Sequence, residues 1–530
     1  MHWPTSDRAR DATAGIFLVL LTLAVYLPHV VRGGWYLDDW SNIAEMHDAM
    51  GTGGLTNVFA HANELVYRPG AATLMTAMFA LCGDGQSSYL ALGTVITALQ
   101  GCLFFLVLRL AGLRTLVAAA AAALLIVLPY IDSSRLWIAG FPLTAALALY
   151  LAGLALALVG LRQQSLRREL IYHAGALLAF LIAVLTYESV APLPVLSVLV
   201  YLTVSGREQA WRRWPFDLVS VAIGLAVIAP RARERRGGDV SPDHLIDRAG
   251  EVGEAAKTVF LESIPLADLL HGPVGAAMVV AAAVGIVMAH GRENPLSGHI
   301  RRWAWIGALG LVFSLGGLVM LLPADSYYVP RPSGIGNRTA AASAPGAVLL
   351  LLSLVVLTCV GLASLFRRAR WARIAVTAAV VVAVVNLGIR EVRQQDAWAQ
   401  SWRETQNIVS AVRGSVGPRP PKGFGVVTFG HRTFVVPADV PTFAASWDLR
   451  GALWHVYDDP AMKAHPYIDS MLCSPGGVVV PASQGFPLPG VGDLTLPYGD
   501  LWFVDVPSRV AVQIPDVETC RGEMPRLSGL

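Results

Sequence analysis

The chain has 530 residues, of which 55% are hydrophobic and only 15% are charged. Soluble domains carry about 25% charged residues, so the composition excludes an ordinary soluble protein and indicates a polytopic membrane protein. The formal net charge of +3 is too small to suggest a nucleic-acid partner, and the sequence contains no Walker loop and no zinc-type cysteine cluster.

Apolar runs occur throughout the chain before Arg390. A membrane-spanning helix needs about 17–25 mostly apolar residues. The runs that approach or reach this length are 13–31, 88–108, 115–131, 136–161, 170–187, 189–204, 272–289, 303–322, 343–366 and 374–389. The run 214–230 carries Asp217 near one end and is counted as the eleventh. The run 71–82 is too short to span, so we expect a helix at the membrane surface.

The arginine-rich segments between these runs predict the orientation. With eleven spans and a cytoplasmic N-terminus, most arginine clusters fall in cytoplasmic segments, as the positive-inside rule requires. If 71–82 also spanned, every later cluster would fall outside. The sequence therefore predicts a multi-pass cell-membrane protein with an extracytoplasmic C-terminus. The first run is long for a signal peptide and lacks a small-residue cleavage site, so we expect it to be retained.

The chain after Arg390 differs in composition from the rest. Segment 391–414 has the pattern of an amphipathic helix. Beyond it the chain is rich in Gly and Pro and contains short strand-like runs. These runs are 423–430, 432–436 and 476–480.

Two domains are expected from this change in composition. Residues 1–390 would form an all-α membrane domain, with juxtamembrane helices in its first outer loop, residues 32–87. Residues 391–530 would form a small α/β or β-rich extracytoplasmic domain. Cys473 and Cys520 both lie in this second domain and would be able to pair in an oxidising compartment, but the sequence leaves their pairing open.

The first outer loop contains the segment WYLDDW, residues 35–40, shortly after the first apolar run. Asp38 and Asp39 stand side by side in it, between tryptophans. The ordinary explanation is that acids are common in outer loops and that aromatic residues anchor membrane interfaces. A functional explanation is that neighbouring carboxylates raise each other's pKa, which suits a group that accepts a proton.

Further charged residues lie in other outer segments of the predicted topology. Arg68 precedes a proline at the start of the 71–82 helix, and Glu188 follows the run 170–187. The remaining members of this set are arginines that bind phosphate well through their planar guanidinium groups. They are Arg135, Arg331 and Arg338. The ordinary alternatives are arginines that anchor helix ends and a Glu188–Arg135 pair that only stabilises the outer face.

The order of these motifs resembles the GT-C superfamily of membrane glycosyltransferases, including its protein O-mannosyltransferase and aminoarabinose transferase branches. The resemblance rests on WYLDDW after helix one, YRPG opening a juxtamembrane helix, TYES at an outer mouth and GNRTAAASAPG opening a late helix. It covers roughly residues 13–366. The chain departs from some relatives in having YES where they have a Lys-Glu pair. The tail matches no known pattern, which leaves the acceptor open.

The resemblance implies a glycosyltransferase that moves a monosaccharide from a polyprenyl-phosphate carrier to an acceptor hydroxyl on the extracytoplasmic face. Asp38 or Asp39, with Asp39 slightly favoured, would take the acceptor's proton. The arginines would bind the lipid phosphate, and Glu188 and Trp40 would complete the substrate site. Among the arginines, the order of preference as phosphate ligands is Arg338, Arg331, Arg68 and Arg135. No cofactor is predicted, although a divalent metal between the acids stays open.

Two other functions are compatible with a polytopic protein. A transporter or flippase of lipid-linked glycans would carry ionisable residues in mid-helix or paired broken helices, whereas the charges here are expected at helix ends. A membrane-anchored cell-envelope assembly protein would use the tail and leave Asp38 and Asp39 without a role. The sequence identifies neither the sugar nor whether the acceptor is a glycan, a lipid or a protein.

Overall fold

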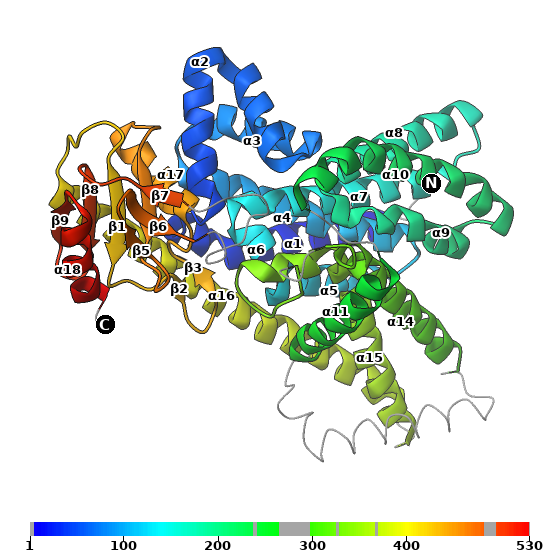
Figure 1. Ribbon diagram of the computed structural model, residues 1–530. Coiled ribbons are helices and arrows are strands. Elements are labelled where there is room, and N and C mark those ends of the chain that lie inside the picture. Colours follow the sequence, from blue (N-terminus) through cyan, green and yellow to red (C-terminus); the bar gives the residue numbers. More distant parts are fainter. Residues whose placement is uncertain are drawn as a thin grey trace.

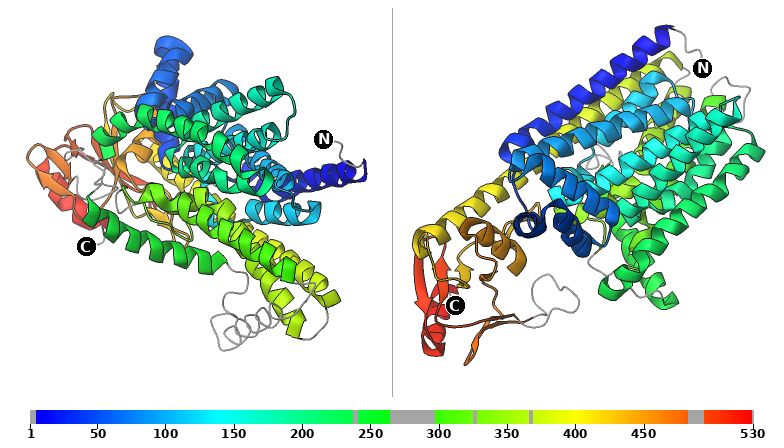
Figure 2. Two further views of the ribbon diagram at one scale, coloured as in Figure 1. Left: turned by 90° about the vertical axis from the view of Figure 1, so that its right-hand side faces the viewer. Right: turned by 90° about the horizontal axis from the view of Figure 1, so that it is seen from above.

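The computed structural model describes residues 5–236, 241–263, 297–324, 328–365, 369–481 and 494–528. A bundle of helices makes up most of the molecule, and a small domain with strands lies at one end of it (Figure 1). The first helix begins at the opposite end of the bundle (Figure 2). The chain is thus a mainly α-helical protein with a strand-containing C-terminal region, as its sequence predicts.

Eight helices in the described part are long and apolar enough to cross a membrane. They belong to α1 (Thr5–Arg32), α4 (Gln86–Leu110), α7 (Phe141–Gly160), α8 (Leu166–Thr186), α10 (Arg207–Arg236), α14 (Ser297–Leu318), α15 (Ala344–Leu365) and α16 (Ala369–Val416). Each of these helices coincides with a predicted span. The span predicted at 272–289 lies outside the described residues.

Two predicted spans are shorter than expected. The run 115–131 forms α5 (Thr115–Ile126), which ends before the 3-10 turn η1 (Pro129–Ile131). The run 189–204 is divided between η3 (Glu188–Val190) and α9 (Pro192–Val204). Proline explains both limits, because it lacks the N–H that continues an α-helix and is tolerated only in the first turn.

Two helices occupy the predicted first outer loop. Helix α2 (Asp38–Val66) is kinked at Gly53 and Gly54, whose backbone angles are not helical. Helix α3 (Pro69–Cys82) has 14 residues, which is about 21 Å and too short for a hydrocarbon core of about 30 Å. The prediction of a short helix at 71–82 is therefore confirmed.

Helix α16 joins two segments that the sequence treats separately. It runs without interruption for 48 residues, through the predicted span 374–389 and the predicted amphipathic helix 391–414. Residue 390 lies inside this helix, so the chain has no linker at the expected domain boundary. The division itself stays a prediction. Figure 2 shows the helix leaving the bundle and reaching the strand-containing domain.

The C-terminal domain contains a four-stranded sheet in the order β4-β1-β8-β9. Strands β4 (Lys463–Pro466), β1 (Gly425–Phe429) and β8 (Leu501–Asp505) are parallel, and β9 (Val510–Ile514) is antiparallel to β8. Every residue of β1 is buried, as expected for the centre of a parallel sheet. Two helices accompany the sheet, α17 (Ser446–Tyr457) and α18 (Val517–Ser528).

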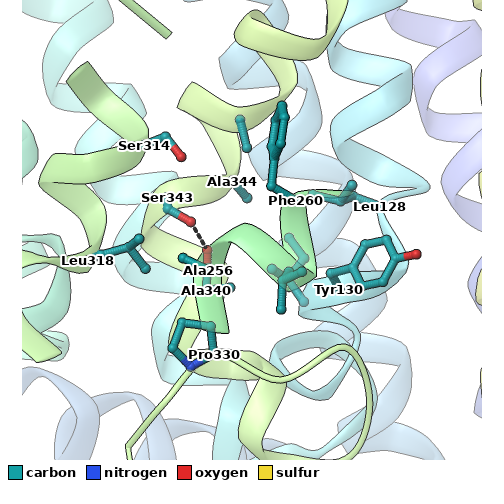
Figure 3. Close-up of a pocket in the computed structure, with 13 residues that line it drawn as sticks. Leu128, Tyr130, Ala256, Phe260, Ser314, Leu318, Pro330, Ala340, Ser343 and Ala344 are labelled. Atoms are coloured by element: carbon teal, nitrogen blue, oxygen red, sulfur yellow. Dashed lines mark hydrogen bonds between the residues drawn. The ribbon is translucent and has the colours of Figure 1, made fainter. Parts of the chain in front are cut away.

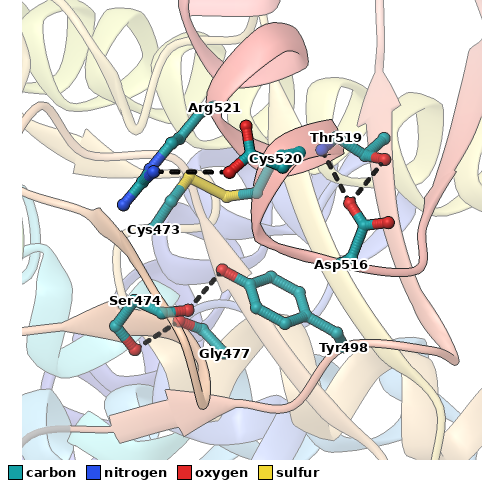
Figure 4. The surroundings of a disulfide bond; sticks show 9 residues. Cys473, Ser474, Gly477, Tyr498, Asp516, Thr519, Cys520 and Arg521 are labelled. Carbon is teal, nitrogen blue, oxygen red and sulfur yellow. Dashed lines mark hydrogen bonds and ion pairs between the residues drawn. A yellow bond between two sulfur atoms is a disulfide. The ribbon is translucent and has the colours of Figure 1, made fainter.

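Two smaller sheets complete this domain. They pair β2 (Phe434–Val435) with β3 (Val440–Pro441), and β6 (Gly477–Val480) with both β5 (Leu472–Ser474) and β7 (Leu494–Leu496). All three predicted strand-like runs contain a strand. A disulfide joins Cys473 of β5 to Cys520 of α18, with a Cα–Cα distance of 6.0 Å (Figure 4). The pairing that the sequence leaves open is therefore formed, and it ties α18 to the three-stranded sheet.

Candidate active site

The two aspartates lie in the first turn of α2, where the helix dipole favours negative charge. The chain reaches them through a tight passage, since a Cβ on Gly34 would lie 2.0 Å from the ring of Trp402 in α16. Leu37 then adopts a positive φ of 46° at the N-cap, and the helix starts at the next residue. This turn sends the two neighbouring carboxylates into different surroundings.

Asp39 is engaged by backbone groups and is only 2% exposed. Its Oδ2 accepts a hydrogen bond from the Tyr36 N–H at 3.0 Å, and its Oδ1 accepts one from the Ala139 N–H at 2.8 Å. Burial raises the pKa of Asp39 well above its usual range, although these backbone bonds oppose the shift. Asp39 thus fastens the first outer loop to the segment between α5 and α7, which points to a structural role.

Asp38 is half-buried and keeps one carboxylate oxygen open. Its Oδ1 accepts a hydrogen bond from the Trp447 indole N–H at 2.9 Å, and its Oδ2 accepts none from the described residues. Burial raises the pKa of Asp38, while the positive charge of Arg338 and the bond from Trp447 lower it. Of the two acids, Asp38 is therefore the one that geometry leaves available for proton transfer. The slight preference for Asp39 drawn from the sequence does not follow from these contacts.

Arg338 comes from the 3-10 helix η5 (Ile335–Ser343), directly before α15. Its guanidinium carbon lies 4.7 Å from the centre of the Trp137 ring, and its Nη1 donates to the Ile335 carbonyl at 3.0 Å. The indole N–H of Trp137 in turn donates to the carbonyl of Tyr36 at 2.9 Å. Three segments far apart in sequence thus meet near the start of α2, and the charge of Arg338 acts on the pKa of Asp38.

The residue before Arg338 holds η5 in place. Asn337 is fully buried, and its side chain accepts hydrogen bonds from the backbone N–H, at 3.1 Å, and the hydroxyl of Ser133 and donates to Asp132. Asp132 also accepts from the indole of Trp398 at 3.2 Å. Asp132 and Asn337 were not predicted from the sequence, because nothing in their local pattern distinguishes a buried polar network from a solvated loop.

Arg68 and Glu188 form a bidentate ion pair. The Arg68 Nη2 lies 2.6 Å from Glu188 Oε1, and the Nε bonds the other oxygen. The Arg68 guanidinium also lies 4.1 Å from the centre of the Tyr187 ring. The two side chains are only 10% and 16% exposed, so the pair joins the start of α3 to η3 in a largely dry setting. The alternative Glu188–Arg135 pair is not formed.

Two predicted binding residues are committed to packing. Arg135 is 3% exposed and donates to the Tyr26 hydroxyl and to the last carbonyls of α5, those of Leu125 and Ile126. It therefore satisfies a helix end, where unpaired carbonyls need donors. Trp40 is buried and stacks on Trp402 with a centroid distance of 5.8 Å. These positions favour a structural role for both side chains.

Arg331 lies in the loop that leads into η5, before Arg338 in the chain. Its Nη1 is 3.1 Å from Asp439 Oδ2 in the C-terminal domain, and both side chains are nearly half exposed. The neighbouring Gly334 has φ of +72°, and a Cβ there would lie 2.3 Å from the Asp439 carbonyl oxygen. The loop before η5 is therefore in direct contact with the C-terminal domain.

Two hollows adjoin these residues. One is a cavity of about 40 Å³ between α11 (Pro242–Ser263), α14 and η5, and its lining is almost wholly apolar (Figure 3). Helix η5 contributes Ala340 and Ser343 to its wall. The other is a cavity of about 20 Å³ between α2, α3 and α4 and is bordered by Asp39. Within the described residues, no cluster of three or more His, Cys, Asp or Glu side chains is arranged to hold a metal ion.

Comparison with known proteins gives matches to solved structures only. No family model and no curated protein matches the chain. ArnT from Cupriavidus metallidurans, solved bound to undecaprenyl phosphate, is 14% identical over 86% of each chain, with a TM-score of 0.43. The Archaeoglobus fulgidus oligosaccharyltransferase is 13% identical over 86% of this chain and 64% of its own length, with a TM-score of 0.42.

A second structure of the archaeal enzyme, named AglB and solved with an inhibitory peptide and a dolichol-phosphate, gives 13% identity and a TM-score of 0.38. All three TM-scores are below 0.5.

Proposed function

We propose that the protein is a glycosyltransferase that moves a sugar from a polyprenyl-phosphate carrier to an acceptor hydroxyl, with Asp38 as the base. The observation that carries the proposal is a half-buried carboxylate that lies close enough to Arg338, on a separate segment, for that positive charge to lower its pKa. One oxygen of this carboxylate accepts no hydrogen bond from the described residues. Transfer from a sugar phosphate needs both groups, one to take a proton and one to receive negative charge.

The reaction follows from these two positions. The acceptor hydroxyl loses its proton to Asp38 Oδ2 as its oxygen bonds to the anomeric carbon. The bond between that carbon and the phosphate oxygen breaks, and the electron pair stays on the carrier phosphate. Arg338 lies where it neutralises this charge, because guanidinium groups bind phosphate oxygens strongly. A raised pKa suits Asp38 to the task, since an ordinary carboxylate is a weak base at neutral pH.

The surroundings of the site support a lipid-borne donor. Helix η5 carries Arg338, whose charge acts on Asp38, and also forms part of the wall of the larger apolar hollow. The ion pair of Arg68 and Glu188 holds α3 against η3, which keeps the first outer loop over the bundle. The role proposed for Arg68 and Glu188 is therefore to shape the site, and Arg331 lies at its edge toward the C-terminal domain.

The disulfide favours an extracytoplasmic site. Disulfides persist in oxidising compartments, and Cys473–Cys520 lies in the same domain as Trp447, which contacts Asp38. A cysteine at Gly414, an exposed position near the end of α16, tests this orientation. In intact cells it should react with an impermeant maleimide more than the unsubstituted protein does. Labelling that appears only after permeabilisation would place the site in the cytoplasm.

The direct test of the reaction uses the purified chain in nanodiscs with a panel of undecaprenyl phosphates that carry radiolabelled sugars. The proposal predicts loss of label from at least one carrier to an acceptor or to water, and none with D38N. A transporter would move the carrier across a vesicle without breaking the sugar–phosphate bond. One observation favours a transporter: α10 contains a buried pair of ionisable residues, Arg213 and Asp217, as transporters do within their spans. These two side chains neutralise each other, however, with an N–O distance of 2.8 Å.

A further inference from the structure

We propose that Trp447 of the C-terminal domain is a positioning residue for Asp38, so that this domain completes the active site. The inference rests on the proposed function and extends it to a residue 409 positions away in the chain. It also gives the tail, for which the sequence offered no role, a part in the reaction.

The contact between Trp447 and Asp38 suits this role. The indole Nε1 lies 2.9 Å from Asp38 Oδ1, within the range of a hydrogen bond to a carboxylate. An indole N–H is a donor only, so it fixes the carboxylate without competing for the acceptor's proton. The bond to Oδ1 leaves Oδ2 as the oxygen that faces the acceptor.

The helix that carries Trp447 is packed directly against the helix that carries Asp38. Helices α17 and α2 are in extensive contact (Figure 1). A Cβ on Gly451 would lie 2.5 Å from the backbone nitrogen of Ser41 and 2.6 Å from the carbonyl carbon of Trp40. Glycine therefore lets the two helix backbones touch, one turn after Trp447 and one turn after Asp38.

The first turn of α17 is also held rigidly. The carboxylate of Asp448 is fully buried and accepts backbone hydrogen bonds from Ala444 at 2.8 Å, Ala445 at 3.1 Å and Leu449 at 2.6 Å. The bond from Ala445, the N-cap residue, satisfies an N–H group that a helix start leaves unpaired, and the bond from Ala444 fixes the residue before it. Trp447 stands next to Asp448 on this fixed turn, so its indole has a defined direction.

Substitution of Trp447 by Phe removes the indole N–H that donates to Asp38 and keeps an aromatic ring at this position. Asp38 interacts electrostatically with Arg338 of η5, Asp39 of its own helix and Asp448 of α17. The substitution leaves all three of these groups in place. Loss of a bond that stabilises the carboxylate raises the pKa of Asp38. Since the base must be ionised, the acid limb of the rate profile then moves to higher pH.

The test compares W447F with W502F in the full-length protein. Trp502 lies on β8 of the same domain, and its buried Nε1 has no hydrogen-bond partner among the described residues, which makes it a matched control. The assay follows sugar release from undecaprenyl phosphate across pH. We expect the acid limb of W447F to lie about 1–2 pH units higher than that of the wild type, so that its loss of kcat is greatest at acid pH and shrinks as pH rises, and W502F to match the wild type.

A second variant tests the position of Trp447 without removing its side chain, in case W447F does not fold. G451A keeps the indole but forces α17 away from α2, whereas G522A adds the same methyl group to α18 in open space. We expect G451A to lower kcat and to move the acid limb in the same direction, with G522A unchanged. Melting temperatures of all four variants show whether the domain remains folded.

The outcomes separate this inference from the proposed function. If the wild type releases no sugar from any carrier in the panel, or if D38N remains fully active, the proposed function fails. If D38N is inactive while W447F and G451A have the rates and pH profiles of W502F and G522A, only the role of Trp447 fails. A loss in W447F that is equal at every pH would also overturn it, because that loss would not act through Asp38.

Discussion

Two sites that each contain a carboxylate and an arginine lie on segments that the sequence predicts to be outside the membrane, and they differ in how completely their carboxylates are paired. Glu188 meets Arg68 through two hydrogen bonds in a largely buried pair. From the described residues, Asp38 receives a hydrogen bond on Oδ1 alone, and the charge of Arg338 lowers its pKa. A closed pair fixes the distance between two segments, whereas an open carboxylate retains an oxygen for a ligand. The same residue types thus hold the fold at one site and are available for chemistry at the other.

The largest expected effect separates Asp38 from its neighbour. D38N removes the proposed base and should lower sugar transfer about 10²- to 10⁴-fold, the usual contribution of general base catalysis, with an unchanged melting temperature. D39N disturbs a buried acceptor of backbone bonds and should lower the free energy of unfolding by about 1–3 kcal/mol. Transfer assays and thermal unfolding of the two proteins measure both.

Asp48, an exposed residue on the same helix, provides the control D48N, which should behave as the wild type. An active D38N together with an inactive but folded D39N would restore the preference for Asp39 that the sequence suggested.

The next prediction tests Arg338, the positively charged residue near Asp38. R338M should lower kcat about 10²- to 10³-fold, the range found when one donor to a developing oxyanion is lost. R338K should recover part of this loss, because lysine supplies charge without the planar fork. The matched control is R393M, which removes an exposed arginine from α16. Equal rates for R338M and R393M would remove Arg338 from the mechanism.

Substitutions in the Arg68–Glu188 pair should change the stability of the protein. E188Q leaves the largely buried Arg68 without its counter-charge and should lower the free energy of unfolding by about 3 kcal/mol, whereas the double variant R68M/E188L should regain part of it. Thermal unfolding in detergent measures both. If E188Q abolished transfer at an unchanged melting temperature, the distinction between the two sites would be reversed and Glu188 would be the reactive carboxylate.

The smallest expected effect is the pH dependence of the wild type. Burial raises the pKa of Asp38, so at any given pH more of it is protonated than an ordinary aspartate. Activity should therefore fall as pH decreases, beginning at a higher pH than the usual aspartate value of about 3.9. A kcat profile that stays flat down to pH 4 would contradict a raised pKa at the base.

The sequence predicts those parts of the architecture that depend on local composition. Eight helices of spanning length coincide with apolar runs, Pro69 opens a short helix, and the strand-like runs of the tail contain strands. The continuity of α16 could not be predicted in this way, because its polar half is stabilised by tertiary packing. Glu391 and Gln395, which look exposed in the sequence, are fully buried.

The site was only partly predictable for the same reason. The loop motifs indicated Asp38, Asp39 and Arg338, but the difference between the two acids depends on the backbone turn at Leu37 and on contacts from distant segments. Trp447 has no local signal, since its role comes from the packing of α17 on α2. Arg135 resembles a phosphate ligand in the sequence and instead satisfies the carbonyls at the end of α5.

The most direct test of the account is a cryo-electron microscopy structure of the full chain with undecaprenyl phosphate. The account predicts that the phosphate lies within hydrogen-bond distance of Arg338, on the side of the site where Asp38 presents its Oδ2. A phosphate bound elsewhere, with Asp38 turned away from it, would contradict the proposed active site.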